Sequence, residues 1–269
     1  MRMTSNAHTH CTWCDGADSA EDMIQAALAL GFDSLGFSCH SPGECLHDEQ
    51  GYKADIMELK NKYSDRISIF CALEQDVSIH PRYTGYEYII GSCHHLPKQD
   101  GAGYLDIMNG NLIADIIDQE FGGDGFAMAK AYYKYEANAM CRLRPDIVGH
   151  FDIIARHNKR LGFLDEENPQ YKEAALEAFD YVLDTIGEYG GMFEVNTSAF
   201  GCGERDVPYP APFLLRHAAQ RGARPIITTD CHFIKGLDAK FTETLQMLLE
   251  AGFKDMAVLT NRGFCNVNI

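Results

Sequence analysis

Apolar, β-rich runs recur along this chain, and most carry a histidine or an acidic residue toward their carboxyl end. The runs cover residues 34–40, 67–77, 87–96, 146–154, 191–198 and 225–232. Continuous apolar runs of this length are typical of parallel strands that are buried on both faces. Between them, helical periodicity appears at 19–31, where Ser19 can cap the helix, and at about 51–64, 103–119, 124–142, 169–188, 211–221 and 239–252. This alternation predicts an α/β fold, either a βα barrel or a doubly wound sheet.

The placement of the polar residues favours the barrel. A barrel brings the carboxyl ends of all its strands to one mouth, whereas an open sheet brings only the strands at its switch point to a ligand. We therefore expect a distorted barrel of about seven strands, with two helices in the long segment 98–145. The chain of 269 residues has no internal repeat and no linker rich in proline, glycine and serine. One domain over residues 1–269 is expected.

Nine residues at the ends of these runs and near the amino terminus have metal-binding side chains: His8, His10, Asp15, His40, Glu74, His94, His150, Asp230 and His232. Imidazole and carboxylate together suit divalent ions such as Zn²⁺, Mn²⁺ and Fe²⁺, and nine such groups exceed the needs of one tetrahedral ion. His8 and His10 lie on one side of an extended segment. Alone, such a pair is often two surface histidines, and Glu74 alone would suit a solvated strand end. Together, the nine residues predict a multinuclear metal site and a hydrolase.

The charge of the chain bears on its partners. It has 39 acidic and 23 basic residues, a formal net charge of −16. This charge repels polyanions, so a small substrate is favoured over nucleic acid. The amino terminus lacks the apolar core of a signal peptide, and no segment has the length of a membrane span. We therefore expect a cytoplasmic protein that does not bind membranes.

The ten cysteines are scattered through apolar runs, so we expect reduced thiols rather than disulfides. Cys39, Cys93 and Cys231 each precede a predicted metal-binding histidine. Because successive side chains of a strand point to opposite faces, these three thiols are expected to pack in the core. Cys11 and Cys14 have the CxxC spacing of redox dithiols, but without a second such pair or a helix-opening context a redox role is not expected.

Six short motifs follow one another along nearly the whole chain: HTHCTWCDG, FSCHSP, ALEQDV, GSCHHL, VGHFDI and TTDCH. In this order they resemble the motifs of the PHP (polymerase and histidinol phosphatase) superfamily of metal-dependent phosphoesterases. The segments FEVNTS, YPAPFLLRHAAQRG and AGFKDMAVLTNRGF look most like those of the monofunctional histidinol-phosphate phosphatases. The resemblance implies one PHP domain with a distorted (β/α)7 TIM-like barrel.

The resemblance also implies two or three bound divalent ions, Zn, Mn or Fe. Carried onto matching positions, it assigns a first ion to His8, His10, Glu74 and Asp230, a second to Glu74, His94 and His150, and a third to Asp15, His40 and His232. Many relatives have a histidine near the position of Asp15. Cys39 stands where the second motif of the family usually has an aspartate.

The activity implied by the resemblance is hydrolysis of L-histidinol phosphate to L-histidinol and phosphate, in histidine biosynthesis. A metal-bridging hydroxide would attack phosphorus, with Glu74, Asp230 and His232 as catalytic residues. Two sets of residues are expected to contact this small phosphorylated substrate: Arg156, Arg160 and Arg205 at the phosphate, and Glu194 and Asn196 at the cationic amine and imidazole. Two alternatives remain open: a related phosphoesterase acting on nucleotides or other small phosphate esters, and a non-catalytic metal-binding or redox-sensing protein. The sequence indicates neither the native metal nor the oligomeric state.

Overall fold

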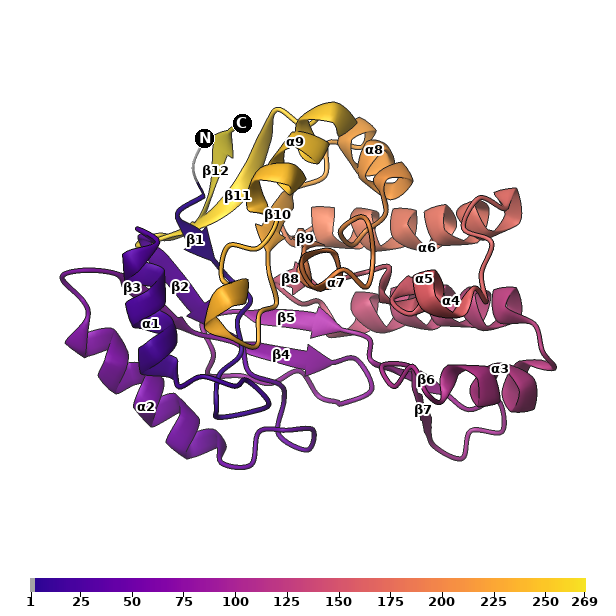
Figure 1. Cartoon of the computed structure of the whole chain (residues 1–269), viewed down its shortest axis with the longest axis horizontal. Coiled ribbons are helices and arrows are strands. Elements are labelled where there is room, and N and C mark those ends of the chain that lie inside the picture. The colour runs from indigo at the N-terminus through magenta and orange to yellow at the C-terminus, as the bar shows by residue number, and fades with distance from the viewer. Residues whose placement is uncertain (1–2) are drawn as a thin grey trace.

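The structure, a computed structural model, describes residues 3–269. Its strands are β1 (Ser5–Asn6), β2 (Ser34–Phe37), β3 (Ser68–Cys71), β4 (Leu73–Asp76), β5 (Ile89–Ser92), β6 (His95–Pro97), β7 (Tyr104–Asp106), β8 (Ile147–Val148), β9 (Met192–Asn196), β10 (Pro225–Thr228), β11 (Asp255–Thr260) and β12 (Gly263–Asn268). Its helices are α1 (Ala20–Ala29), α2 (Glu49–Lys62), α3 (Ile113–Phe121), α4 (Gly125–Leu143), α5 (Asn158–Leu161), α6 (Pro169–Gly187), α7 (Ser198–Cys202), α8 (Pro212–Gln220) and α9 (Phe241–Ala251). Figure 1 shows α1 and α2 outside β2 and β3, and α4 and α6 on the far side of the strands.

The parallel strands form a ring. β1, β2 and β3 pair in parallel, as do β4, β5, β8, β9, β10 and β11, and β12 adds antiparallel to β11. Two parallel bridges join these sheets at the carboxyl ends of their strands, Thr9 with Cys231 and His40 with Glu74. The first junction is supported by His10 N, which donates to Cys231 O at 2.9 Å. With β3 and β4 taken as one interrupted strand, the order β1, β2, β3/β4, β5, β8, β9, β10 forms the distorted (β/α)7 barrel predicted from the sequence.

Side chains alternate between the inside and the outside of this ring. The inner apolar cluster consists of Ala7, Ala72, Tyr88, Ile90, Ile147, Met192, Ile226, Ala257 and Leu259. Their strand neighbours Ile89, Val148, Phe193 and Ile227 belong to the larger core that includes the helices. The alternation follows from the two-residue period of a strand. In β5, β9 and β10 an inward apolar residue is followed, two positions later, by an inward polar one. The inward polar residues therefore lie nearer the carboxyl ends of the strands, next to a layer of apolar side chains.

Polar caps fix where the helices begin. Ser19 Oγ accepts a hydrogen bond from Asp22 N at 3.1 Å before α1, as the sequence predicted. Asp124 caps α4 in the same way, and Asn168 caps α6, which then begins with Pro169. These caps satisfy backbone N–H groups that have no partner in the first helical turn. No helix in the described part of the chain has the length and apolar character needed to cross a membrane.

The segment 98–145 contains the two predicted helices, but the prediction of a helix from residue 103 was wrong. β6 and β7 form a hairpin there, and α3 begins only at Ile113. Gly101 and Gly103 have positive φ angles of 73° and 120°, which glycine adopts without steric cost. Asp106 Oδ1 then accepts a hydrogen bond from Met108 N at 2.9 Å, which stabilises a turn instead of a helix.

Candidate metal centre

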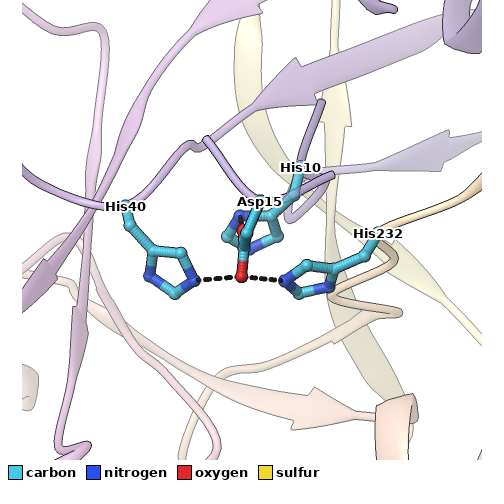
Figure 2. Close-up of side chains that lie close together, drawn as sticks. All are labelled: His10, Asp15, His40 and His232. Atoms are coloured by element: carbon cyan, nitrogen blue, oxygen red, sulfur yellow. Dashed lines mark ion pairs between the residues drawn. The ribbon is translucent and has the colours of Figure 1, made fainter. Parts of the chain in front are cut away.

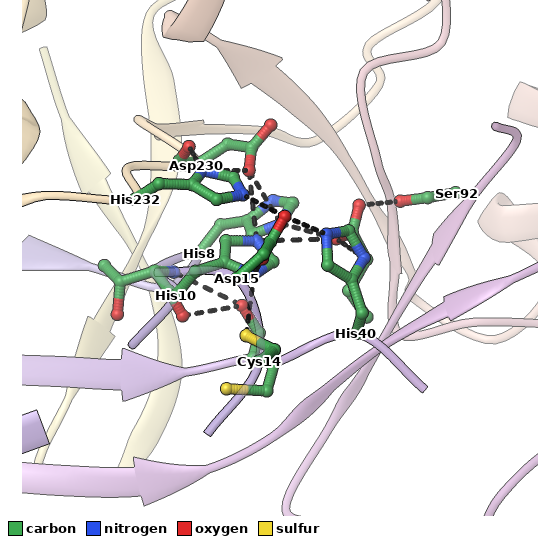
Figure 3. Close-up of polar contacts among 12 residues, drawn as sticks. His8, His10, Cys14, Asp15, His40, Ser92, Asp230 and His232 are labelled. Carbon is green, nitrogen blue, oxygen red and sulfur yellow. Dashed lines mark hydrogen bonds and ion pairs between the residues drawn. The ribbon is translucent and has the colours of Figure 1, made fainter. Parts of the chain in front are cut away.

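The nine predicted metal-type residues gather at the carboxyl-terminal mouth of the barrel. Each stands within or just beyond a strand, or in the next loop: His8 and His10 after β1 with Asp15 beyond them, His40 after β2, Glu74 in β4, His94 after β5, His150 after β8, and Asp230 and His232 after β10. Figure 3 shows side chains from these separate elements turned toward one another. Because the strand ends converge here, residues distant in sequence become neighbours.

A first group is formed by His8, His10, Glu74 and Asp230, whose ligand atoms all lie within 4.8 Å of one another. Both Nε2 atoms are 3.4 Å from Glu74 Oε2, and they are 3.5 Å and 3.1 Å from Asp230 Oδ1. Ligands of a tetrahedral ion with bonds of about 2.1 Å lie about 3.4 Å apart, which matches these separations. The two nitrogens and Glu74 Oε2 are buried, and within residues 3–269 they make no hydrogen bond. Such orphaned atoms are costly without a partner, so the group fits a metal ion.

Three further imidazoles lie around the carboxylate of Glu74. His40 Nδ1 lies 3.0 Å from Oε2, whereas His150 Nε2 and His94 Nε2 lie 3.0 Å and 3.4 Å from Oε1. Ser92 Oγ donates to Oε1 at 2.5 Å and holds the carboxylate in place. A carboxylate whose two oxygens have different histidine neighbours is suited to bridge two cations.

Asp15 lies among the remaining histidines, as Figure 2 shows. Its Oδ2 is 3.6 Å from His40 Nε2 and 3.3 Å from His232 Nε2, and its Oδ1 is 3.7 Å from His10 Nδ1. The side chain of Asp15 is 44% exposed, so this group opens to solvent. These are the residues that the resemblance assigned to a third ion, with His10 added, and their binding of metal stays a prediction.

The buried charges of the mouth stabilise one another. Burial disfavours the charged form of His8, but Glu194, Asp230 and Glu74 outweigh it and hold its pKa well above 6.5. Burial likewise opposes the charge of His94, yet Glu74 raises its pKa to about 10. Burial disfavours ionised Glu74, but His8 and the neighbouring imidazoles hold its pKa well below the usual value. Because the surrounding carboxylates favour the protonated form of His8 and His94, an entering cation competes with protons for these rings.

Glu194 holds His8 and is turned away from solvent. Its Oε1 accepts hydrogen bonds from His8 Nδ1 at 2.6 Å and Thr228 Oγ1 at 2.5 Å. Its Oε2 accepts from His150 N at 2.8 Å and Asn196 Nδ2 at 2.9 Å. A histidine that donates from Nδ1 leaves Nε2 to bind a metal. Glu194 and Asn196 are 1% and 0% exposed, and their side-chain oxygens already accept hydrogen bonds from within the chain. This geometry gives no support to the predicted contact of these two residues with substrate, which stays a prediction.

The three arginines expected at the phosphate have different surroundings. Arg156 lines the cavity at the mouth, where its Nε donates to Glu204 Oε2 at 2.7 Å. Arg205 is 5% exposed, and its Nη2 donates to Glu166 at 3.0 Å, but its Nε and Nη1 have no hydrogen-bond partner in the described chain. Arg160 lies exposed on α5, outside the cavity lining, so its expected phosphate contact is not retained.

A cavity of about 820 Å³ lies over the metal-type residues, within the range of small-molecule sites. Its wall includes Glu44, Asp106 and Phe233. Sequence reasoning missed Glu44, whose Oε1 is 3.5 Å from His94 Nδ1. The loop that carries Glu44 has no periodic pattern, and closeness in sequence to His40 was the one signal available.

Three thiols lie against this centre. Cys11 Sγ and Cys39 Sγ are 3.6 Å apart, and Cys14 Sγ is 3.4 Å from His10 Nδ1. Cys11 and Cys39 are fully buried, whereas Cys14 is partly exposed. The burial predicted for Cys39 is confirmed, and the other two cysteines assigned to the core are buried as well. The contact between Cys14 and His10 was not predicted, because CxxC spacing alone does not reveal what the sulfur touches.

A family model described as PHP domain matches residues 6–198 of the chain. The matched segment contains every metal-type residue of the mouth except Asp230 and His232.

Individual proteins are similar over most of the chain. A Schizosaccharomyces pombe protein named "Probable histidinol-phosphatase" is 25% identical over 261 residues, 86% of this chain and 81% of the relative. A Deinococcus radiodurans protein of the same name is 28% identical over 267 residues, 92% of this chain and 93% of the relative. The crystal structure of Lactococcus lactis histidinol phosphate phosphatase, complexed with zinc, L-histidinol and phosphate, has a TM-score of 0.71 at 18% identity and covers 97% of this chain and 98% of that one. This last likeness establishes the fold.

Proposed function

The chain belongs to the PHP domain family, and from this premise we propose that it is a metal-dependent phosphatase that hydrolyses L-histidinol phosphate to L-histidinol and phosphate. Two curated relatives that align with most of the chain are named as histidinol-phosphatases. A protein of the same fold holds zinc, L-histidinol and phosphate in its crystal structure. These similarities support both the reaction and a place in histidine biosynthesis.

The observation that carries the proposal is the surroundings of Glu74. Its Oε2 has no hydrogen bond and lies between His8 and His10, while its Oε1 faces His94 and His150. Glu74 is thus suited to bridge two divalent ions, and the group around Asp15 to hold a third. Zinc, manganese and iron all suit such a set of imidazoles and carboxylates.

Divalent ions bound in this mouth would lower the pKa of a water molecule to near neutrality and would neutralise charge on the phosphate oxygens. The side chains supply the geometry. His232 Nδ1 donates to the backbone oxygen of Asp230 at 3.0 Å, which leaves Nε2 free to face Asp15 and the cavity. Asp230 has a left-handed φ of 50°, a conformation that costs about 1–2 kcal/mol. Asn196 Nδ2, which donates to Asp230 Oδ2 at 3.3 Å, helps to hold it there. We assign the catalytic roles to Glu74, Asp230 and His232.

Groups of both charges suit a zwitterionic substrate. We assign the phosphate to Arg156 on the cavity wall. Arg205 is buried and outside the cavity lining, so its contact with phosphate stays a prediction, although phosphate oxygens would satisfy its two unpartnered nitrogens. Glu44 and Asp106 line the same cavity and replace Glu194 as the proposed acceptors for the amine and imidazole. The net charge of −16 attracts the cationic part of such a substrate.

The proposed function is tested by phosphate release from protein stripped of metal and reconstituted separately with Mn²⁺, Zn²⁺ or Fe²⁺. L-Histidinol phosphate is compared with nucleoside monophosphates and sugar phosphates, and Glu74→Gln serves as the matched inactive variant. We expect a strong preference for L-histidinol phosphate that Glu74→Gln abolishes. A preference for nucleotides would refute the substrate while keeping the metal site. Metal binding without any turnover would refute the enzyme activity itself.

A further inference from the structure

One aromatic side chain at the mouth of the barrel is exposed rather than packed in the core. Residues 3–269 contain six large apolar side chains that are exposed: Met57, Tyr104, Leu112, Tyr181, Phe233 and Leu249. Phe233, at 48% exposure, is the one of these that lines the cavity over the metal-type residues. Single apolar residues on an open surface are common, whereas an aromatic ring in the wall of a small-molecule cavity is suited to contact a ligand.

The contacts of Phe233 within the fold do not explain its position. Among the described residues it belongs to neither apolar cluster, whereas Met108, the other large apolar residue of the cavity wall, packs against the larger core. A Cβ added at Gly236 would lie 3.5 Å from Phe233 Cε2, so one edge of the ring lies beside a residue without a side chain. Leaving a phenyl ring in water costs free energy that a second apolar surface would recover.

The backbone on both sides of Phe233 is held in place. The backbone oxygen of His232 accepts a hydrogen bond from Ala17 N at 2.7 Å, and Ile234 N donates to Asp18 Oδ2 at 2.8 Å. These two bonds tie the segment to the loop that follows β1. A ring on an ordered backbone loses little conformational freedom when a ligand covers it, which favours binding.

The chemistry of the proposed substrate supplies a partner for this ring. In L-histidinol phosphate, three carbon atoms join the imidazole ring to the ester oxygen, so the imidazole stays close to a phosphate held at the metal centre. Phe233 directly follows His232, whose Nε2 lies 3.3 Å from Asp15 Oδ2 at that centre. Glu44 and Asp106 line the cavity and can accept hydrogen bonds from the imidazole nitrogens, but carboxylates do not cover the apolar faces of the ring.

We propose that Phe233 is a specificity-determining residue, which binds the imidazole ring of the substrate in an offset-stacked or edge-to-face contact. This role rests on the proposed function and adds a contact that the polar residues of the cavity cannot make. Loss of the phenyl ring should weaken the binding of L-histidinol by about 5–30-fold. Ethanolamine, which keeps the amino alcohol but has no imidazole, should bind equally well with or without it. A nucleotide base also stacks on a phenyl ring, so Phe233 selects against phosphate esters without an aromatic ring, such as sugar phosphates.

The test uses the zinc-loaded full chain and follows L-histidinol and ethanolamine by proton NMR. The ring current of Phe233 should displace the resonances of the imidazole protons, and a titration gives the Kd of each ligand. Phe233→Leu removes the aromatic ring but keeps an apolar side chain, and Phe233→Tyr keeps the ring. Tyr181→Leu is the matched control, because Tyr181 is a 51% exposed aromatic residue of α6 outside the cavity lining. Phosphate release from L-histidinol phosphate is measured on the same samples.

We expect Phe233→Tyr and Tyr181→Leu to bind L-histidinol with the native Kd and the native displacement of its imidazole resonances. In Phe233→Leu that displacement should shrink and the Kd should rise by about 5–30-fold, while the Kd of ethanolamine stays native. Native binding of L-histidinol by Phe233→Leu, or an equal loss of ethanolamine binding, would overturn the proposal.

A second measurement needs no variant. Phe233 is the one phenylalanine in the cavity lining of the described chain, so bound L-histidinol should show nuclear Overhauser effects between its imidazole protons and phenylalanine ring protons. Should Phe233→Leu fail to fold, the absence of these effects in the native chain would overturn the proposal. Turnover of L-histidinol phosphate without the ring contact would leave the proposed function standing. The ring contact without turnover would refute the function and keep the contact.

Discussion

Replacing Glu194 with glutamine should weaken metal binding without removing any proposed ligand. Each carboxylate oxygen accepts two hydrogen bonds, Oε1 from His8 Nδ1 and Thr228 Oγ1, and Oε2 from His150 N and Asn196 Nδ2. Glutamine offers one acceptor oxygen and one NH₂ group. Whichever way the glutamine amide turns, its NH₂ group faces two hydrogen-bond donors that Glu194 had satisfied. His8 also loses its anionic partner.

The magnitude follows from burial. Loss of the outer partner of a ligating histidine reduces metal affinity by about 10–100-fold, or about 1.4–2.8 kcal/mol. Glu194 is 1% exposed, so water cannot replace the lost acceptor. Each donor left unpaired adds about 1–3 kcal/mol to the cost of folding. We therefore expect Glu194→Gln to bind zinc at least about tenfold more weakly and to unfold at a lower temperature.

Competition with a chromophoric chelator measures the zinc affinity, and circular dichroism during heating measures folding on the same samples. Glu243→Gln is the matched control, because Glu243 is exposed at the start of α9 and pairs only with Lys240, at 2.9 Å, among the described residues. The control should keep native affinity. Native zinc affinity in folded Glu194→Gln would refute the argument that Glu194 acts through His8.

Three further predictions follow from the mouth of the barrel. Arg156→Gln should lower kcat/KM for the phosphate ester by about 10–100-fold, mainly by raising KM, because a charged hydrogen bond is lost. Arg160→Gln, at the exposed arginine of α5, should change kcat/KM little. Steady-state kinetics of the two variants measure both effects. Zinc uptake should release protons, and the apparent affinity for zinc should rise with pH up to about pH 9. Burial lowers the pKa of His10, but contacts such as that with Asp230 raise it to about 9. Protons therefore compete with zinc for this ring below that pH. Calorimetry in buffers of different protonation enthalpy tests this, and equal heats would contradict it. Gly149→Ala should lower the free energy of unfolding by about 1–3 kcal/mol and should also reduce activity. The added Cβ would lie 2.7 Å from Ser92 Oγ, which donates to the carboxylate of Glu74. Native unfolding of this variant in urea would contradict the prediction and show that the strand can move aside.

One physical reason made both the barrel and the set of residues at its mouth predictable from the sequence. In a parallel barrel the end of every strand faces the same side, so a polar residue at the end of an apolar run has its place set by the fold. His40, His94, His150 and Asp230 all follow this rule. The helix start at Ser19 was equally predictable, because a cap is a local interaction.

Depth within the barrel was not predictable from the same pattern. Met192, Glu194 and Asn196 all point inward from β9, but the sequence does not state which layer lies at the mouth and which lies below it. Glu194 proved to be in the layer that supports His8. The second gap was the short helix α5, because its four residues carry no repeating apolar pattern that would fix the direction of Arg160. The third gap was the turn around Gly101 and Gly103, whose positive φ angles were not foreseen from the sequence.

The most direct test of the account is anomalous diffraction from crystals of the zinc-loaded protein, with data collected on both sides of the zinc absorption edge. The account predicts one peak about 2.0–2.2 Å from His8 Nε2 and from Glu74, and a second at the same distance from Glu74 and His94. Two peaks that share Glu74 would support a bridging carboxylate at a multinuclear centre. Zinc bound only elsewhere, or no peak beside Glu74, would contradict the central claim.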